Sequence, residues 1–469
     1  MDDELELVEE QPNTAAAAAT APAVALDLGH IRQRILTLSL PSLAELLLAT
    51  LFGMVDMMMV GGIGPAAIAA IGLTNQPMFL GLAIFMALNV GTTALVARSI
   101  GAKNVGDACE ATRQTMAITL VLGTLVSAAG VIFAEPIIRA MGAEPDALYW
   151  GVPYLRIVAG GLIFQTISMS LSAVLRGAGD TKTPMVYNII ANFVNIIGNA
   201  LLINGWLGAP RLLVAGAAWA TSFSRFVGAV LMIRVVYSGK FIINLRHLER
   251  FRLRWDLVTR IVKVGTPAAI EQFLMRFGMI MFTRVVSSLG TVVFAAHQVA
   301  INIVGLSFTP GQAFGMAATT LVGQSLGAKN PDLAEKSGYE TRRIGAYVAC
   351  AMALVFFFGG RYIARLYTSD PQVTADTALA LKIIAIVQPL QSTQFILAGG
   401  LRGAGDTFWP LVSTMAGVVV IRVVLAMLFV NVLHLGLMGA WMAMACDQFV
   451  RSLVITLRYR SGKWKHIKV

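Results

Sequence analysis

The seven residues Leu175-Arg-Gly-Ala-Gly-Asp-Thr181 return unchanged as Leu401-Arg-Gly-Ala-Gly-Asp-Thr407, 226 residues further along the chain. The same offset relates Gly101-Ala-Lys-Asn104 to Gly327-Ala-Lys-Asn330. Single residues that share this offset are Pro41 and Pro267, Glu45 and Glu271, Gly64 and Gly290, Arg156 and Lys382, and Pro184 and Pro410. One register over so many positions indicates an internal duplication, so we expect two copied halves.

The composition argues against a soluble protein and favours one that crosses a membrane many times. Of the 469 residues, 57% are hydrophobic and only 13% are charged, whereas a soluble domain usually carries about 25% charged residues. From residue 35 onward, apolar stretches recur that are long enough to cross a bilayer as helices. We place twelve of them, roughly at 35–60, 67–98, 114–137, 148–174, 184–204, 213–236, 260–287, 293–325, 343–366, 376–400, 409–433 and 437–457.

The repeat and the helices together predict an all-α membrane fold with two pseudo-twofold related six-helix bundles. An even number of helices in each half gives both halves the same orientation, a pattern found in secondary transporters, with a central cleft between the halves. We expect a disordered acidic tail at 1–29, an N-lobe at 30–237, a basic linker at 238–259, a C-lobe at 260–460 and a basic tail at 461–469.

The net charge of +11 is explained by membrane orientation rather than by nucleic-acid binding. Most Lys and Arg residues fall at one set of helix ends, in the linker and in the C-terminal tail, while the opposite loops hold Arg139, Arg211, Arg361 and Arg365. Basic loops face the cytoplasm. We therefore predict a multi-pass protein of the plasma (inner) membrane with both termini cytoplasmic, in contact with the lipid bilayer and with no nucleic-acid partner.

Four acids lie within predicted spans, where an ionisable side chain is costly and usually functional: Glu45, Asp56, Glu271 and Asp447. Glu45 and Glu271 are repeat mates, whereas the position equivalent to Asp56 is Phe282. Asp56 follows Glu45 by eleven residues, about three helical turns, so both side chains point the same way. We interpret Asp56 as a candidate H⁺ or Na⁺ site; a capped or snorkelling acid at a helix end is the alternative.

The predicted fifth helix carries a stripe of amides, Asn188, Asn192, Asn195 and Asn199, spaced by four, three and four residues. Amide oxygens suit a hard cation, and hydrogen bonds between helices are the alternative. Arg422 lies inside the predicted eleventh helix and requires an acidic or carbonyl partner. Asp447 is that partner or a functional acid.

The repeated Arg-Gly-Ala-Gly-Asp-Thr motif is expected to form a tight turn between two helices. Arg176 and Asp180, or Arg402 and Asp406, could close a local ion pair there. The motif lacks the Gly-Lys-Ser/Thr of a phosphate-binding loop. Cys109, Cys350 and Cys446 lie far apart and suggest neither a disulfide framework nor a zinc site. Because no nucleophile lies beside a base, we do not expect an enzyme.

These motifs resemble the multidrug and toxic compound extrusion (MATE) family over about residues 30–460. The resemblance rests on both duplicated motifs, on Val-Asp-Met-Met-Met-Val-Gly-Gly at 55–62 and on Ala-Ala-His-Gln-Val-Ala-Ile-Asn at 295–302. It implies a secondary active antiporter without a cofactor, a monomer that exports small organic, often cationic compounds in exchange for H⁺ or Na⁺ by alternating access.

The resemblance also implies roles for individual residues. Asp56 matches the family's acid on helix one, Pro41 resembles the proline where that helix bends, and Asn195, Asn199 and Thr221 resemble the rest of the N-lobe cation site. Asp56, Asn195 and Asn199 would hold Na⁺ if that is the coupling ion. Asn192 and Glu45 are further candidates for binding the ion or the substrate.

A second site in the C-lobe is doubtful, because the family's acids there align with Met275 and Gln391. Glu271 stands one turn before Met275, the repeat mate of Gln391 is Gln165, and Asp447 is a further candidate. The alternative function is a lipid-linked precursor flippase, which would need a basic cleft. The cations that keep this alternative open are Arg156, Arg225, Arg276, Arg284, Lys382 and Arg422.

Overall fold

Long apolar helices joined by short connections make up the protein in the computed structural model, which describes residues 28–142, 144–208, 210–239, 241–246 and 252–467. The first half contains α2 (Leu28–Gly61), α3 (Pro65–Gly101), α4 (Val105–Ile132), α5 (Ala134–Ala140), α6 (Pro145–Gly160), α7 (Leu162–Ala178), α8 (Lys182–Asn204), η1 (Trp206–Gly208) and α9 (Leu213–Tyr237). The second half contains α10 (Trp255–Ser287), α11 (Thr291–Gly327), α12 (Pro331–Arg365), α13 (Pro371–Gly403), α14 (Phe408–Thr414), η2 (Met415–Arg422), α15 (Val423–Met427), η3 (Leu428–Val432), α16 (Gly436–Arg460) and η4 (Lys463–His466). All but two residues of the predicted acidic tail lie outside the described residues.

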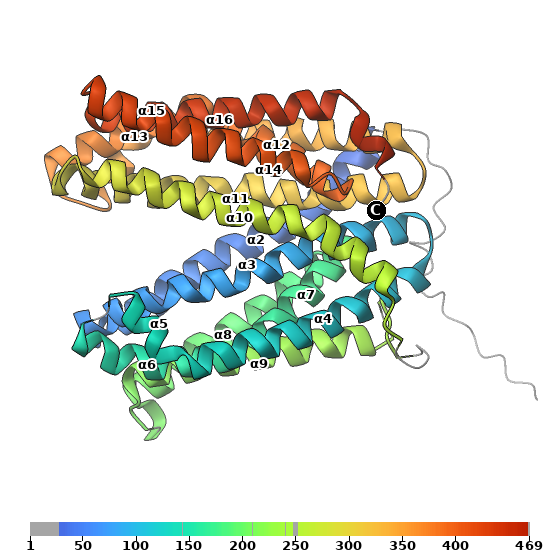
Figure 1. Ribbon diagram of the computed structural model, residues 1–469, viewed down its shortest axis with the longest axis horizontal. Helices are drawn as coiled ribbons and strands as arrows, with labels where there is room; N and C mark the ends of the chain where they lie inside the picture. The colour runs from blue at the N-terminus through green and yellow to red at the C-terminus, as the bar shows by residue number, and fades with distance from the viewer. Residues whose placement is uncertain (1–27, 143, 209, 240, 247–251, 468–469) are drawn as a thin grey trace, which may run out of the picture.

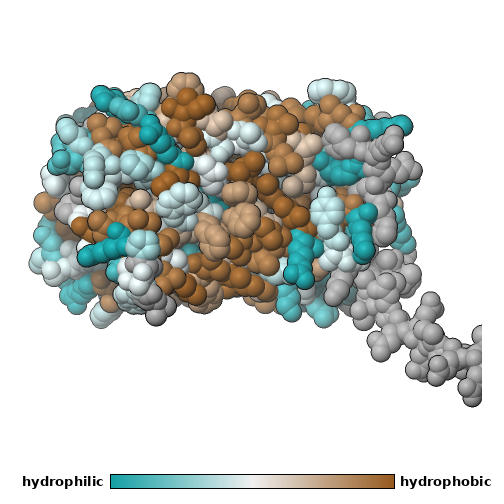
Figure 2. Space-filling model, turned by 90° about the horizontal axis from the view of Figure 1, so that it is seen from below, coloured by the Kyte–Doolittle hydropathy of each residue, from teal (hydrophilic) through white to brown (hydrophobic). Residues whose placement is uncertain are grey.

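Most of these helices have the length and composition of membrane spans. In the described part of the chain, nine spans meet both requirements, and the bent pair α6 and α7 makes a tenth. The helices α10 and α16, with 33 and 25 residues, occupy the remaining two of the twelve predicted spans but are not among those that meet both requirements. Figure 2 shows a broad apolar belt across the face in view, with polar residues gathered toward both ends. An apolar exterior is what lipid tails require.

The helices pack into two lobes, with α2–α9 in one and α10–α16 in the other (Figure 1). We call these the N-lobe and the C-lobe. The connection between them and the C-terminus lie at the same end of the bundle, which we call the linker end. Helices α3 and α10 run close together there and diverge toward the opposite end. The all-α, two-lobe prediction is confirmed.

The two lobes meet at the linker end through the repeated Gly-Ala-Lys-Asn motifs. A Cβ atom on Gly101 would lie 1.9 Å from the backbone oxygen of Gln324, and one on Gly327 would lie 2.1 Å from that of Arg98. Arg98 and Gln324 are themselves separated by the repeat offset of 226. Each lobe therefore presses a glycine against the equivalent turn of the other, and only glycine permits so close an approach.

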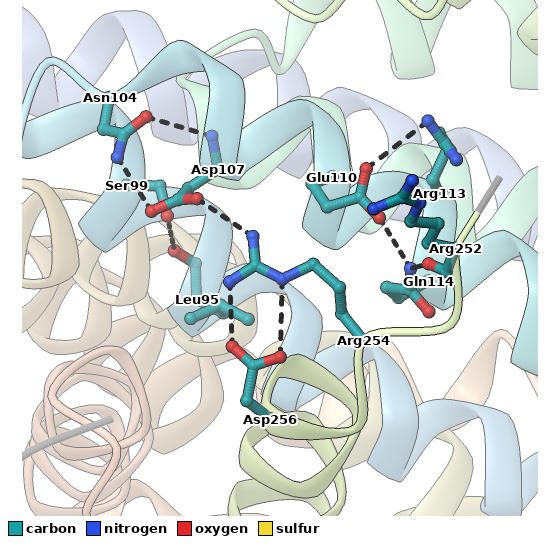
Figure 3. A network of polar contacts seen from close by, with 10 residues as sticks. All are labelled: Leu95, Ser99, Asn104, Asp107, Glu110, Arg113, Gln114, Arg252, Arg254 and Asp256. Carbon is teal, nitrogen blue, oxygen red and sulfur yellow. Dashed lines mark hydrogen bonds and ion pairs between the residues drawn. The ribbon is translucent and has the colours of Figure 1, made fainter. Parts of the chain in front are cut away.

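Side-chain hydrogen bonds and ion pairs add to this contact. Arg98 Nη2 donates to the Ala404 oxygen at 2.9 Å, and Thr320 Oγ1 donates to the Arg176 oxygen at 2.8 Å. Figure 3 shows Arg254, just before α10, between Asp256 at 2.9 Å and Asp107 of the N-lobe at 3.5 Å. The start of the C-lobe is thereby tied to α4.

Candidate functional site

A cavity of about 1110 Å³ lies between the two lobes and receives side chains from both. This volume exceeds the range of roughly 300–1,000 Å³ that is usual for pockets holding drug-sized molecules. Its walls combine apolar side chains with amides, hydroxyls and charged groups. Of the predicted site residues, Glu45, Asp56, Gln165, Asn192, Asn195, Thr221 and Glu271 line it.

Asp56 lies at one end of a polar chain that joins three helices of the N-lobe. Asn199 on α8 donates from Nδ2 to Asp56 Oδ1 on α2 and also approaches Asn195 Oδ1 at 3.4 Å. Asn195 in turn donates to Thr221 Oγ1 on α9 at 3.2 Å. The structure thus brings together the four residues that the family resemblance implies for the N-lobe cation site.

Among these four hydrogen-bonded residues, one buried side-chain atom has no hydrogen-bond partner. Asn199 is fully buried, and its Oδ1 is unpaired among the described residues. A buried carbonyl oxygen without a donor costs free energy unless water or a cation meets it. Together with the Asp56 carboxylate, Asn199 Oδ1 is a suitable ligand for a hard cation.

Asp56 has no basic residue close to it in the sequence, but in the folded protein Arg225 on α9 lies near it. It lines the same cavity, donates to the Val158 oxygen at 3.3 Å and interacts electrostatically with Asp56 and Tyr154. Sequence reasoning counted Arg225 only among the cations that would favour a basic cleft. The carboxylate of Asp56 thus has one partly buried guanidinium in its surroundings.

The repeat mates Glu45 and Glu271 make the same interaction in the two lobes. Arg176 donates to Glu45 Oε1 at 2.6 Å, and Arg402 donates to both oxygens of Glu271 at 2.7 and 2.9 Å. The third partner is also a repeat mate: Asn188 donates to Glu45 at 2.6 Å, and its counterpart Thr414 donates to Glu271 at 3.2 Å. Both acids hold the first helix of their lobe against the fourth and fifth.

The predicted local ion pairs within the repeated motif are therefore wrong. Arg176 and Arg402 reach the first helix of their lobe instead of Asp180 and Asp406. Asp180 accepts from the Thr183 backbone nitrogen at 3.0 Å, and Asp406 accepts from Arg458 at 2.7 Å. Tight helix packing places the arginine opposite a buried glutamate, where its charge offsets another buried charge. The sequence did contain a sign of this pairing, because Glu45 and Glu271 are separated by the same offset as Arg176 and Arg402.

Arg422 and Asp447 form a buried ion pair, as one of the two sequence alternatives predicts. Arg422 Nε donates to Asp447 Oδ2 at 2.9 Å, and Arg422 lies over the Phe282 ring at 5.6 Å. Arg422 ends η2, a stretch of π-helix that interrupts the eleventh span and has no counterpart in α8. Such insertions are frequent at functional sites. Asp447 does not line the cavity.

The remaining predicted site residues lie outside the hydrogen-bonded group around Asp56. Asn192 donates to the Asn188 backbone oxygen at 2.9 Å. Gln391 faces a separate small pocket, whereas its mate Gln165 faces the central cavity. Pro41 lies inside α2, which continues through it as helix. The described residues contain no cluster of three His, Cys, Asp or Glu side chains suited to a metal ion.

Comparison with known proteins gives one consistent relationship. A family model described as MatE matches residues 41–201 and again residues 267–428. "Probable multidrug resistance protein NorM" of Thermotoga maritima is 31% identical over 443 residues, which cover 93% of this chain and 94% of that one. "Multidrug resistance protein PmpM" of Pseudomonas aeruginosa is 29% identical and covers 84% of each chain.

Solved structures agree with the fold. One described as the "outward-facing conformation of a multidrug resistance MATE family transporter" superimposes with a TM-score of 0.84 at 25% identity, covering 92% of this chain and 97% of that one. A Pyrococcus furiosus transporter, described as having a binding pocket of reverse polarity, superimposes with a TM-score of 0.84 at 24% identity, covering 92% and 95%.

Proposed function

Since the chain belongs to the MatE family of multidrug efflux transporters, we propose that it is a secondary antiporter that expels small organic compounds in exchange for H⁺ or Na⁺. The observation that carries the proposal is the polar chain around Asp56, which faces a cavity large enough for the cargo. In this proposal the ion gradient supplies the energy for transport, so no residue needs a catalytic role.

In this proposal, Asp56 is the residue that binds the coupling ion. A proton would neutralise its carboxylate, and Na⁺ would bind the carboxylate together with Asn199 Oδ1 after the Asn199 amide, whose Nδ2 now donates to Asp56, has turned over. Asn195 and Thr221 hold Asn199 and α9 in place around it. An ion drives transport only if it binds the two states of the protein with different affinity. Glu45 and Glu271 are already occupied by arginines, so their role is to hold the helices together.

The described conformation represents one of the two access states. The lobes are in contact at the linker end, which the excess of Lys and Arg assigns to the cytoplasm. With that orientation the structure corresponds to the outward-facing state, in which the cytoplasmic side is closed. The likeness to an outward-facing relative supports this assignment. The flippase alternative is not favoured, because the similar proteins are multidrug resistance proteins.

Efflux from proteoliposomes tests the proposal. Vesicles are loaded with rhodamine 123, a fluorescent organic cation, and either a pH gradient or a Na⁺ gradient is imposed. We expect one of these gradients to accelerate dye release at least severalfold. Antiport is ruled out if neither gradient changes the rate.

A substitution then tests the coupling site. Asp56→Asn keeps the side-chain shape but removes the charge, and it should abolish the gradient dependence. The matched control is Asp376→Asn, which removes an acid from α13 that does not line the cavity. Full coupling in Asp56→Asn would show that the ion binds elsewhere.

A further inference from the structure

The charges that line the cavity are unequal in number. Six arginines line it, which are Arg176, Arg225, Arg276, Arg402, Arg422 and Arg451. Only three carboxylates do so, which are Glu45, Asp56 and Glu271. A cavity for simple organic cations would be expected to show the opposite balance.

The excess lies in the C-lobe, and one of its charges, that of Arg451, follows from a break in the repeat. Arg225 and Arg451 are repeat mates, but the acid that interacts electrostatically with Arg225 is Asp56, whose mate is Phe282. In the N-lobe, Glu45 pairs with Arg176, and Asp56, which pairs with no other described arginine, interacts electrostatically with Arg225. In the C-lobe, the position that would balance Arg451 is a phenyl ring.

The acids nearest to Arg451 are already paired with other arginines. Arg451 interacts electrostatically with Asp447 and Glu271. Each of these acids, however, already forms an ion pair: Asp447 with Arg422 and Glu271 with Arg402. Arg451 itself forms no ion pair with any described residue; its side chain donates to Thr414 Oγ1 at 3.4 Å. Three guanidinium groups that line the cavity therefore share two carboxylates, of which only Glu271 lines it.

The lining of the cavity that carries this excess charge also contains buried polar atoms without a hydrogen-bond partner. Arg451 is 2% exposed, and its Nε has no hydrogen-bond partner among the described residues. The same is true of Nδ1 of His297, another buried residue that lines the cavity. Buried groups of this kind normally have partners, and a buried charge normally has a counter-charge.

We propose that Arg451, one α-helical turn from the Asp447 that pairs with Arg422, binds an anionic group of the transported compound, such as a carboxylate. Guanidinium binds carboxylate through two parallel hydrogen bonds, which gives orientation as well as affinity. This inference rests on the proposed export function and narrows its substrate class. A compound with one cationic and one carboxylate group would place the cation toward Asp56 and the carboxylate toward Arg451.

Two dyes that differ in one group provide the test. Rhodamine 110 carries a free carboxylate, and rhodamine 123 is its methyl ester. Binding of each to the purified protein in phosphatidylcholine nanodiscs is measured by fluorescence polarisation. The wild-type protein should bind rhodamine 110 at least fivefold more tightly. In Arg451→Gln, we expect rhodamine 110 affinity to fall about tenfold while rhodamine 123 affinity is retained, which also shows that the variant is folded.

Two further variants separate a binding site from a general effect of positive charge. Arg451→Lys retains the charge without the two parallel donors, so it should restore part of the preference. Lys382→Gln removes a cation from an exposed position on α13 that does not line the cavity. It should leave both affinities unchanged.

Several outcomes would overturn the inference. The first is equal binding of the two dyes by the wild-type protein. The second is an equal loss of rhodamine 110 affinity in Lys382→Gln and Arg451→Gln. The third is loss of the preference for rhodamine 110 when anionic lipid is added, which would show that the site binds a lipid headgroup. Failure of the export proposal has a different signature: rhodamine 123 would not leave proteoliposomes in response to either gradient, while the Arg451-dependent preference in binding persisted.

Discussion

Asp56 on α2 accepts a hydrogen bond from Asn199 on α8, and the position equivalent to Asp56 in the C-lobe is Phe282. The polar chain of the N-lobe therefore has no copy in the C-lobe, although both lobes share the same helices. In its place, the C-lobe has the Arg422–Asp447 pair and the Phe282 ring beneath Arg422. The two duplicated lobes thus present chemically different side chains to the central cavity.

The hydrogen bond between Asp56 and Asn199 leads to a prediction about ion affinity. Asn199→Asp would place two carboxylates in contact at a buried site, where they strongly favour a shared cation or proton. We expect Na⁺ to stabilise this variant against heating at concentrations about tenfold lower than those the wild type requires. The measurement is the melting temperature in detergent across a Na⁺ series, with K⁺ as the control. An unchanged Na⁺ response would argue against a cation at this site.

The Glu271–Arg402 pair leads to a prediction about stability. Glu271 is buried, so Glu271→Gln leaves the Arg402 charge without its partner, at a cost of roughly 2–4 kcal/mol, allowing for the partial exposure of Arg402. The double variant Glu271→Gln with Arg402→Gln should recover much of this loss. Melting temperatures of the two single variants and the double variant form the test. Additive losses would show that the two groups do not interact.

The same cycle on Glu45 and Arg176 is a matched comparison, because these residues form the equivalent pair. We expect coupling of the same sign and similar size in both lobes. We also expect Glu271→Gln to retain gradient-driven dye release, since this acid holds helices together. Loss of release in a variant that remains folded would instead give Glu271 a part in coupling.

The contact between Gly327 and Arg98 leads to a prediction about the closed end. Any side chain at residue 327 would collide with the Arg98 backbone oxygen, so Gly327→Val should separate the lobes at the linker end. Spin labels attached after Lys103→Cys and Lys329→Cys, in a background without Cys109, Cys350 and Cys446, report this distance. The distribution should shift by several ångströms to longer values. Gly305→Val is the control, since a Cβ atom there would meet no neighbouring atom within 4 Å.

The repeat mates Gln165 and Gln391 differ in what they face, which gives a matched pair of substitutions. Gln165 lines the central cavity, whereas Gln391 faces a separate small pocket. We expect Gln165→Leu to change rhodamine 123 affinity several fold and Gln391→Leu to leave it unchanged. Fluorescence polarisation with both variants decides this. An equal effect of the two would mean that the central cavity is not where the dye binds.

Several features of this protein were predictable because they depend on residue type and spacing alone. The offset between the two Arg-Gly-Ala-Gly-Asp-Thr motifs reveals the duplication, and the family model matches twice with that same spacing. Helical spans follow from apolar runs, since backbone groups in lipid must be satisfied within each span. The spacing of Asn195 and Asn199 places them on one face of a helix, and the structure joins them to Asp56 and Thr221.

Interactions between helices far apart in the chain were decided by the tertiary structure. Arg176 is four residues from Asp180 but pairs with Glu45, 131 residues away, because helix packing determines which buried charges meet. The sequence does not distinguish Arg225 and Arg451 from the other basic residues. Helix packing places Arg225 near Asp56, which pairs with no other described arginine, and Arg451 near carboxylates that already pair with arginines. The sequence by itself determined the duplicated helices and the lone Asp56. Only the tertiary structure decided which charges are balanced, since balance depends on distances across the cavity and between helices.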